Sequence, residues 1–206
     1  MPESPYSVSD VMTHTVVAVG TKASFKQIVE LLDEWKVSAL PVLAGEGRVI
    51  GVVSEADLLA KEEFRDTDRG DLAERVKAGA LTAGDLMSTP AVTAHADATV
   101  AEAARIMAHR HVKRLPVVDG VGVLQGVVSR SDLLKVFLRG DEEIADEVRH
   151  HVLDVLPPGD TLKASVEDGT VTLSGSLPER GLVPVIARAV RSVEGVVDVR
   201  LDLSYR

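Results

Sequence analysis

The chain contains the same nine-residue phrase twice. It reads GVVSEADLL from Gly51 and GVVSRSDLL from Gly126, seventy-five residues later. The same shift aligns the openings DVM and DLM, and it aligns two LPV segments at Leu40 and Leu115 without a gap. Self-similarity at a fixed period indicates one supersecondary unit used more than once. The sequence therefore predicts two copies of one unit, at residues 8–62 and 81–139, joined by a charged linker at 63–80.

Each copy shows the same order of secondary-structure signals. A short strand, TVVAV from Thr15 or AVTA from Ala91, precedes a helix that is capped by Ser24 or Thr99. Both helices have apolar residues at helical spacing, and Glu102 completes a capping-box pattern in the second. Two β-branched runs joined by glycine turns predict a hairpin, and a short helix closes the unit. The predicted fold class is α/β of the α+β kind, with two pseudo-symmetric β-α-β-β-α units.

The end of the repeated phrase carries possible binding chemistry. Ser54 and Ser129 stand where a strand ends and a helix begins, and Asp57 and Asp132 follow within the first helical turn. A helix start of this kind favours a phosphate, and a carboxylate can accept hydrogen bonds from the hydroxyls of a ribose. Ser-x-x-Asp is equally an ordinary helix start, so the pattern alone favours a structural cap.

These motifs, in this order and spacing, resemble a tandem pair of CBS domains over Val8 to Leu138. The resemblance implies that the pair binds adenine nucleotides such as AMP, ADP or ATP as regulatory ligands. It also implies a homodimer, for which the helices beginning at Ser24 and Thr99 are the candidate interface. The ligand-binding positions that follow from the resemblance and from the repeated phrase are Val16, Val37, Ser38, Ala39, Pro41, Ser54, Asp57, Ala91, Val112, Lys113, Arg114, Pro116, Ser129, Arg130 and Asp132.

The two copies differ in charge at equivalent positions. Glu55 follows the first serine where Arg130 follows the second, and Ser38-Ala39 in the first copy correspond to Lys113-Arg114 in the second. Arginine and lysine bind phosphate, whereas glutamate repels it. We therefore expect two unequal sites, with the tighter site for a phosphorylated adenosine at the second copy. The alternative is that the basic residues form a solvated face.

The last third of the chain shows a different pattern. DEEIADEVRHHVLDVL from Asp141 predicts an amphipathic helix, and TLKASVEDGTVTLSGSL predicts a hairpin about a Glu-Asp-Gly turn. A second helix with Pro184 in its first turn and a final alternating strand complete an α-β-β-α-β order. This segment, residues 141–206, resembles a BON domain. Such domains are often exported and are proposed to bind phospholipid, but an excess of acidic residues in this segment does not support attraction to an anionic bilayer.

Composition narrows the function classes. The chain has 206 residues and a formal net charge of −9, which argues against binding to nucleic acid. It has no cysteine, which excludes disulfides and thiolate chemistry. His109 and His111 do not share a helix face, and His150 and His151 are adjacent, so no metal site is expected. The sequence shows no export signal and no apolar run of membrane-spanning length, so we expect a cytoplasmic location.

Three classes of function remain. The first is a ligand-sensing regulatory protein whose CBS pair modulates the BON domain or a partner. The second is an interaction or membrane- or envelope-associated protein in which the BON domain is the working part, with phospholipid as its candidate contact, and the CBS clefts are structural. The third is an enzyme, which we do not expect, because the sequence lacks a P-loop, a GxGxxG or HExxH motif and a nucleophile triad.

Overall fold

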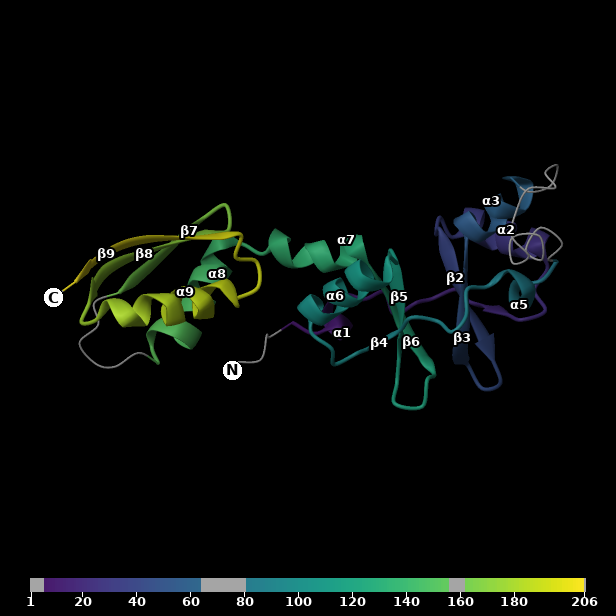
Figure 1. Ribbon diagram of the computed structural model, residues 1–206, viewed down its shortest axis with the longest axis horizontal. Helices are drawn as coiled ribbons and strands as arrows, with labels where there is room; N and C mark the ends of the chain where they lie inside the picture. Colours follow the sequence, from purple (N-terminus) through teal and green to yellow (C-terminus); the bar gives the residue numbers. More distant parts are fainter. Residues whose placement is uncertain (1–5, 64–80, 156–161, 206) are drawn as a thin grey trace. The chain divides into compact units, whose positions relative to one another are not determined.

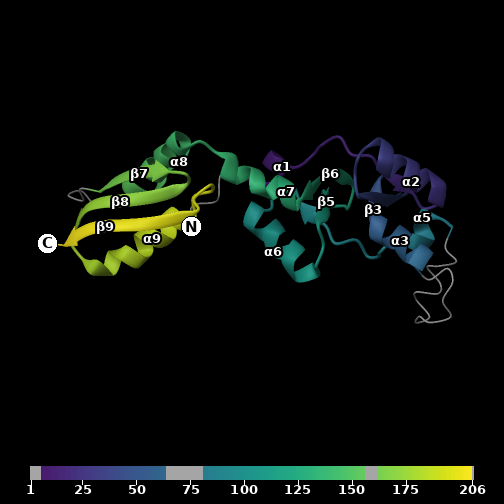
Figure 2. The same cartoon turned by 90° about the horizontal axis from the view of Figure 1, so that it is seen from above.

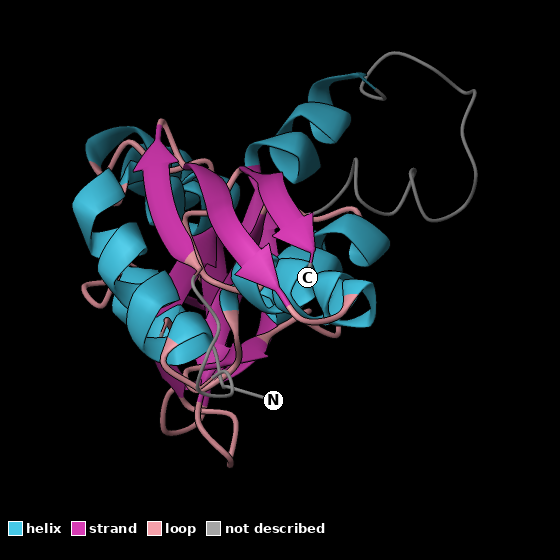
Figure 3. Cartoon of the chain, turned by 90° about the vertical axis from the view of Figure 1, so that its left-hand side faces the viewer, coloured by secondary structure: helices cyan, strands magenta, loops and turns pink. Residues whose placement is uncertain are grey.

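The computed structural model describes residues 6–63, 81–155 and 162–205 (Figure 1). These residues form two compact units, one of Met12–Arg130 and the other of the described parts of Met1–Val11 and Ser131–Arg206. Helices and strands both contribute throughout, so the fold is of the mixed α/β class that the sequence predicts (Figure 3). The sequence also indicates a short helix from Asp71 within the charged linker and a chain break at PPGD from Pro157, and both lie outside the described residues.

The two repeats have the predicted β-α-β-β-α order. The first contains α1 (Val8–Val11), β1 (Val19–Gly20), α2 (Phe25–Glu34), β2 (Ala39–Ala44), β3 (Arg48–Ser54) and α3 (Glu55–Glu63). The second contains α5 (Ala83–Leu86), β4 (Ala94–His95), α6 (Val100–Arg110), β5 (Arg114–Val118), β6 (Leu124–Ser129), α7 (Arg130–Leu133) and the 3-10 helix η1 (Leu134–Leu138). In each sheet the first strand pairs parallel to the second, and the second pairs antiparallel to the third.

The first strand of each repeat is shorter than predicted and begins later. The sequence predicts a strand from Thr15, whereas β1 begins at Val19, because only Val19 and Gly20 pair with β2. The second copy shows the same change, with β4 beginning at Ala94 instead of Ala91. The residues just before Val19 and Ala94 have high strand propensity, but the neighbouring strand pairs only with the residues that follow. Tertiary context here overrides the local propensity.

The predicted helix caps are present. The Ser24 hydroxyl accepts a hydrogen bond from the backbone N–H of Gln27 at 3.3 Å, and the Gln27 side chain accepts from the Ser24 N–H at 3.0 Å. Thr99 and Glu102 form the same reciprocal pair, at 3.1 and 3.0 Å. Each capping box satisfies two of the N–H groups that a helix start leaves without a partner in the helix.

The repeats exchange their opening segments. Ser88, just after α5 of the second repeat, forms two backbone hydrogen bonds with Val52 of β3 in the first repeat, at 2.9 and 3.1 Å. Thr13 forms the equivalent pair with Val127 of β6, at 2.9 and 3.0 Å. The core of the first repeat also includes Ala83 from α5. The two repeats are therefore interlocked within the compact unit of Met12–Arg130.

The C-terminal segment folds in the predicted α-β-β-α-β order. It contains α8 (Asp141–Val148), the π-helical turn η2 (Arg149–Leu153), β7 (Lys163–Glu167), β8 (Thr170–Leu177), the 3-10 turn η3 (Arg180–Leu182), α9 (Val183–Arg191) and β9 (Asp198–Tyr205). Strand β8 lies between antiparallel β7 and parallel β9 (Figure 2). Pro184 lies in the first turn of α9, as predicted.

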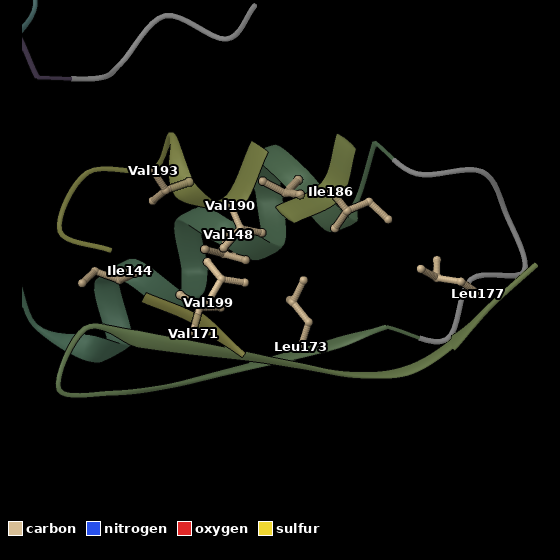
Figure 4. Close-up of a cluster of buried hydrophobic side chains, with 10 residues drawn as sticks. Ile144, Val148, Val171, Leu173, Leu177, Ile186, Val190, Val193 and Val199 are labelled. Carbon is tan, nitrogen blue, oxygen red and sulfur yellow. The ribbon is translucent and has the colours of Figure 1, made fainter. Parts of the chain in front are cut away.

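One aliphatic cluster forms the core of this C-terminal segment. Apolar side chains of α8 and α9 point toward one face of the sheet (Figure 4). The amphipathic pattern of the first helix puts Ile144, Val148, Val152 and Val155 on one side, and the first three of these are buried. The fourth, Val155, is 72% exposed because the helix ends before it, at Leu153.

Candidate functional site

A cavity of about 300 Å³ lies beside the first repeated serine and aspartate. Its lining includes Ser54 and Asp57 from the junction of β3 and α3. Acids, hydroxyls and cations all contribute to its wall. Its volume is at the lower end of the usual range for small-molecule sites, which is about 300–1,000 Å³. The remaining residues of its wall are Ser38, Ala39, Val52, Glu55, Ala56, Ser88, Pro90, Ala91, Val92, His111, Val112, Lys113 and Arg114.

Asp57 lies at the centre of a small hydrogen-bond network. Its Oδ2 accepts from the Ser54 hydroxyl at 2.7 Å and from the Ser54 backbone N–H at 3.0 Å. Its Oδ1 accepts a longer hydrogen bond, 3.3 Å, from the hydroxyl of Ser88. A carboxylate offers about four acceptor positions, so a ligand hydroxyl could replace the long contact from Ser88 while Ser54 keeps the carboxylate in place.

The same cap geometry also occurs away from this cavity. Thr82 donates to Asp85 from its hydroxyl at 2.7 Å and from its N–H at 3.2 Å, and Ser7 and Asp10 form the same pair. The hydrogen bond from the Thr82 hydroxyl lowers the pKa of Asp85 below its ordinary value, and Ser7 has the same effect on the pKa of Asp10. A hydroxyl three residues before an aspartate therefore builds a cap in several places, and what distinguishes Ser54 and Asp57 is their position in the cavity wall.

Basic residues of the second repeat line this first-repeat cavity. Lys113 and Arg114 lie in its wall with His111, and Nη2 of Arg114 donates a hydrogen bond to Oγ of Ser38. Arginine and lysine are the side chains that bind phosphate most readily. Glu55 and Asp57 supply negative charge in the same wall, so the cavity presents both signs.

This arrangement bears on the prediction that the two repeats bind a phosphorylated ligand with unequal affinity. From the sequence, Lys113 and Arg114 are expected to favour phosphate at the Ser129 copy, but they line the cavity at Asp57. The exchange of opening segments explains the difference, because the Ser88–Val52 pairing brings the second repeat against β3. A repeat alignment assigns each residue to its own copy and cannot reveal such an exchange. Lys113 and Arg114 therefore do not single out the site at Ser129, and the difference between Arg130 and Glu55 remains a prediction of two unequal sites.

Eight of the fifteen predicted residues line this cavity. They are Ser38, Ala39, Ser54, Asp57, Ala91, Val112, Lys113 and Arg114. Val37 lines a neighbouring groove, while Pro41 and Pro116 are buried in β2 and β5. Val16 is half-buried before β1. Sequence reasoning missed several residues of the wall, among them Ser88 and Pro90, whose signal in the sequence is their position just after the DLM opening.

The predicted residues at the end of the second repeat make other contacts. Ser129 ends β6 opposite Arg114 in the ladder. The Arg130 backbone N–H donates to the carbonyl of Lys113 at 3.1 Å, and its guanidinium donates to the carbonyl of Val112 at 3.2 Å. Asp132 lies in the first turn of α7, and its carboxylate is 2.6 Å from Nζ of Lys135. The second acid thus has a lysine partner one helical turn later.

Metal sites and membrane-spanning helices are two further possibilities. Within residues 6–63, 81–155 and 162–205, no three His, Asp or Glu side chains lie close enough together to hold a metal ion. No helix in these same ranges has the length and the apolar character that crossing a bilayer requires.

Comparison with known proteins identifies two domain families in the chain. The CBS domain family matches residues 8–63 and 83–139, and the BON domain family matches residues 140–206. The chloroplastic CBS domain-containing protein CBSX2 of Arabidopsis thaliana is 31% identical over 153 residues, which are 65% of this chain and 64% of that protein. Protein MJ1426 of Methanocaldococcus jannaschii is 27% identical over 160 residues, 64% of this chain and 90% of that protein.

Solved structures agree with this assignment. The crystal structure of CBSX2 in complex with AMP aligns with a TM-score of 0.59 at 31% identity, covering 65% of this chain and 97% of that one. The CBS domain pair of protein MJ0100, in complex with 5-methylthioadenosine and S-adenosyl-L-methionine, has a TM-score of 0.55 and covers 64% of this chain and 95% of that one. Its 20% identity shows a shared fold. The chain belongs to the CBS domain family, with two CBS domains followed by a BON domain.

Proposed function

We propose that the protein is a ligand-sensing regulator whose CBS pair binds an adenosine-containing ligand, such as AMP, ADP or ATP, in the cavity at Asp57. The observation that carries the proposal is the gathering of an acid, hydroxyls and two basic residues in one cavity. In this proposal Asp57 accepts hydrogen bonds from the ribose hydroxyls, which take over the long contact from Ser88. Lys113 and Arg114 pair with the phosphate.

The comparisons support the ligand class. CBSX2, which shares 31% identity with this chain, was crystallised with AMP. We extend this to the present chain because its own cavity has the donors and acceptors that a nucleotide requires. The proposed role is binding and regulation in the cytoplasm, with the BON domain or a partner protein as the responding part.

We also propose that the protein is a homodimer. A groove of about 730 Å³ runs along α2 and α3 of the first repeat, and several of its apolar side chains are exposed, including Val29 at 42% and Leu59 at 67%. Trp35, at the end of α2, is 48% exposed. Exposed apolar residues that gather in one place commonly mark an interface. Light scattering coupled to size exclusion should give twice the chain mass, and Leu59→Glu should reduce it to the mass of one chain.

A thermal-shift titration with AMP, ADP and ATP tests the proposed binding. A ligand at one hundred times its dissociation constant stabilises the folded state by about 2.7 kcal/mol, so at least one nucleotide should raise the melting temperature clearly. Asp57→Ala should remove the shift. Asp85→Ala is the matched control, because Asp85 forms the same cap with Thr82 and does not line the cavity. If no nucleotide stabilises the wild type but vesicles containing anionic phospholipid bind it, the BON domain is the working part instead.

A further inference from the structure

Strand β9 lies at the edge of the BON sheet. It pairs along its whole length with β8, from Asp198 opposite Thr170 to Tyr205 opposite Leu177 (Figure 2). Within the described parts of the chain, no strand pairs with its other side. An edge strand presents backbone N–H and C=O groups with which another strand can pair, and natural proteins usually keep such edges short. β9 has eight residues, so its edge offers a long surface for pairing.

The two faces of β9 differ in character, because side chains alternate along a strand. Val199 is buried in the core of the BON domain, and Leu203 packs against this core. Leu201 lies between them on the same face, yet its side chain is 42% exposed. Arg200 and Asp202 lie on the opposite face, and both are exposed. Among the residues that the structure describes, neither of these two charges has an ion-pair partner.

The sequence of β9 is complementary to itself in one antiparallel register. With Leu201 opposite Leu201 of a second copy, Arg200 of each copy faces Asp202 of the other. Val199 then faces Leu203 on the apolar side. A shift of two residues keeps the same faces together but places Arg200 against Arg200, or Asp202 against Asp202. Opposite charges across a strand pair stabilise it and like charges destabilise it, so the charges favour the register about Leu201.

We propose that β9 pairs antiparallel with β9 of a second copy of this chain, about a two-fold axis at Leu201. The two three-stranded sheets then join into one continuous sheet, and each Leu201 is covered by the other. The N–H of Val199 already donates to the carboxylate of Asp198 at 2.8 Å, so the new hydrogen bonds centre on the residues that follow.

This contact is separate from the groove along α2 and α3, and it does not rest on the proposed function. One strand edge from each copy buries much less than the roughly 1,600 Å² of a standard protein interface. The pairing is therefore weaker than the contact proposed at α2 and α3, and it needs a higher protein concentration. A chain with two self-complementary surfaces can assemble beyond a dimer.

Oxidative cross-linking of the full chain tests whether the two edges meet. The chain has no cysteine, so one introduced thiol reports on one position. Leu201→Cys lies on the proposed two-fold axis and should form a disulfide-linked dimer in concentrated protein. Ser165→Cys, exposed on the edge strand β7 of the same sheet, is the control and should react far more slowly. Equal rates at the two positions would overturn the proposal.

The same experiment separates this pairing from the contact at α2 and α3. Adding Leu59→Glu to Leu201→Cys removes the apolar side chain in the groove and should leave the cross-link in place. A cross-link that disappears with Leu59→Glu would show that the β9 edges do not associate by themselves, which contradicts the pairing.

Charge reversal tests the register. Arg200→Asp and Asp202→Arg each place two pairs of like charges opposite one another, and each should weaken self-association by about tenfold. The double variant R200D/D202R exchanges the charges and restores both attractive pairs, so it should associate as the wild type does. Sedimentation equilibrium in the Leu59→Glu background measures the association, and thermal unfolding checks that these exposed substitutions leave the fold intact. Single variants without effect, or a double variant that does not recover, would contradict the pairing about Leu201.

Discussion

Gly51 lies directly against the backbone of Ser88. A Cβ built on Gly51 would be 3.0 Å from the Ser88 carbonyl oxygen and 2.5 Å from Sδ of Met87. Gly126 has the equivalent position against Thr13 and Met12, at 2.9 and 2.7 Å. The glycine that opens each repeated phrase is therefore required by the crossing of the other repeat's opening segment.

Substituting alanine for Gly51 should destabilise the protein by about 1–3 kcal/mol, the usual cost of forcing an extra group into a packed interior. The backbone of Ser88 cannot move away without losing its hydrogen bonds to Val52. Urea unfolding measures the loss. Gly120→Ala is the control, since a Cβ at Gly120 meets nothing within 4 Å. Equal stability of the two variants would show that the crossing is loosely packed.

Removing the basic residues should weaken nucleotide binding. Arg114→Ala should lower the affinity for AMP by about tenfold or more, because a hydrogen bond to a charged group contributes roughly 1.5–3 kcal/mol. The effect should be smaller for adenosine, which has no phosphate. Isothermal titration calorimetry compares the two ligands, with Arg105→Ala, an exposed arginine of α6, as the control. An equal loss for AMP and adenosine would mean that Arg114 shapes the cavity and does not bind phosphate.

Asp141 should stabilise the BON domain through its hairpin. Its carboxylate accepts hydrogen bonds from the backbone N–H groups of Asp168 and Gly169, both at 2.9 Å. These two residues form the turn between β7 and β8 and have φ of +48° and +70°. Asp141→Ala should cost about 1–3 kcal/mol in unfolding free energy. Glu142→Ala, at an exposed position one residue later, should have little effect in the same urea titration.

Low pH should weaken the ion pair between Arg139 and Glu143, whose side chains lie 2.8 Å apart. The hydrogen bond from Arg139, followed by that from Tyr6, holds the pKa of Glu143 below its ordinary value. A carboxyl group whose pKa is lowered by folding stabilises the native state fully above its unfolded pKa, about 4.3, and loses this contribution as the pH falls through the lowered native value.

Thermal unfolding at pH 7 and at pH 3 measures this contribution. Glu143→Gln should lose less stability between these two pH values than the wild type does. The exposed Glu142→Gln should retain the wild-type dependence. An unchanged pH dependence in Glu143→Gln would show that other groups control the acid response.

The elements that sequence reasoning predicted correctly are those specified by local chemistry. Ser24 and Thr99 cap their helices, and the Asp168-Gly169 turn closes its hairpin, because each depends on residues within a few positions along the chain. The length of β1 and the residues of the cavity wall depend instead on which distant segments pair with β2 and β3. Two nearly identical copies give equal signals for pairing within a repeat and between repeats, so the arrival of Lys113 at Asp57 was not predictable from either copy alone.

The pairing of Ser88 with Val52 and of Thr13 with Val127 has a consequence for how this duplication can be divided. One repeat expressed by itself would contain its last strand, β3 or β6, but would lack the opening segment of the other repeat that pairs with this strand. Such a half-length product would reach a native-like state only by recruiting a second molecule, so its folding should depend on concentration, whereas the intact pair folds as a unimolecular reaction.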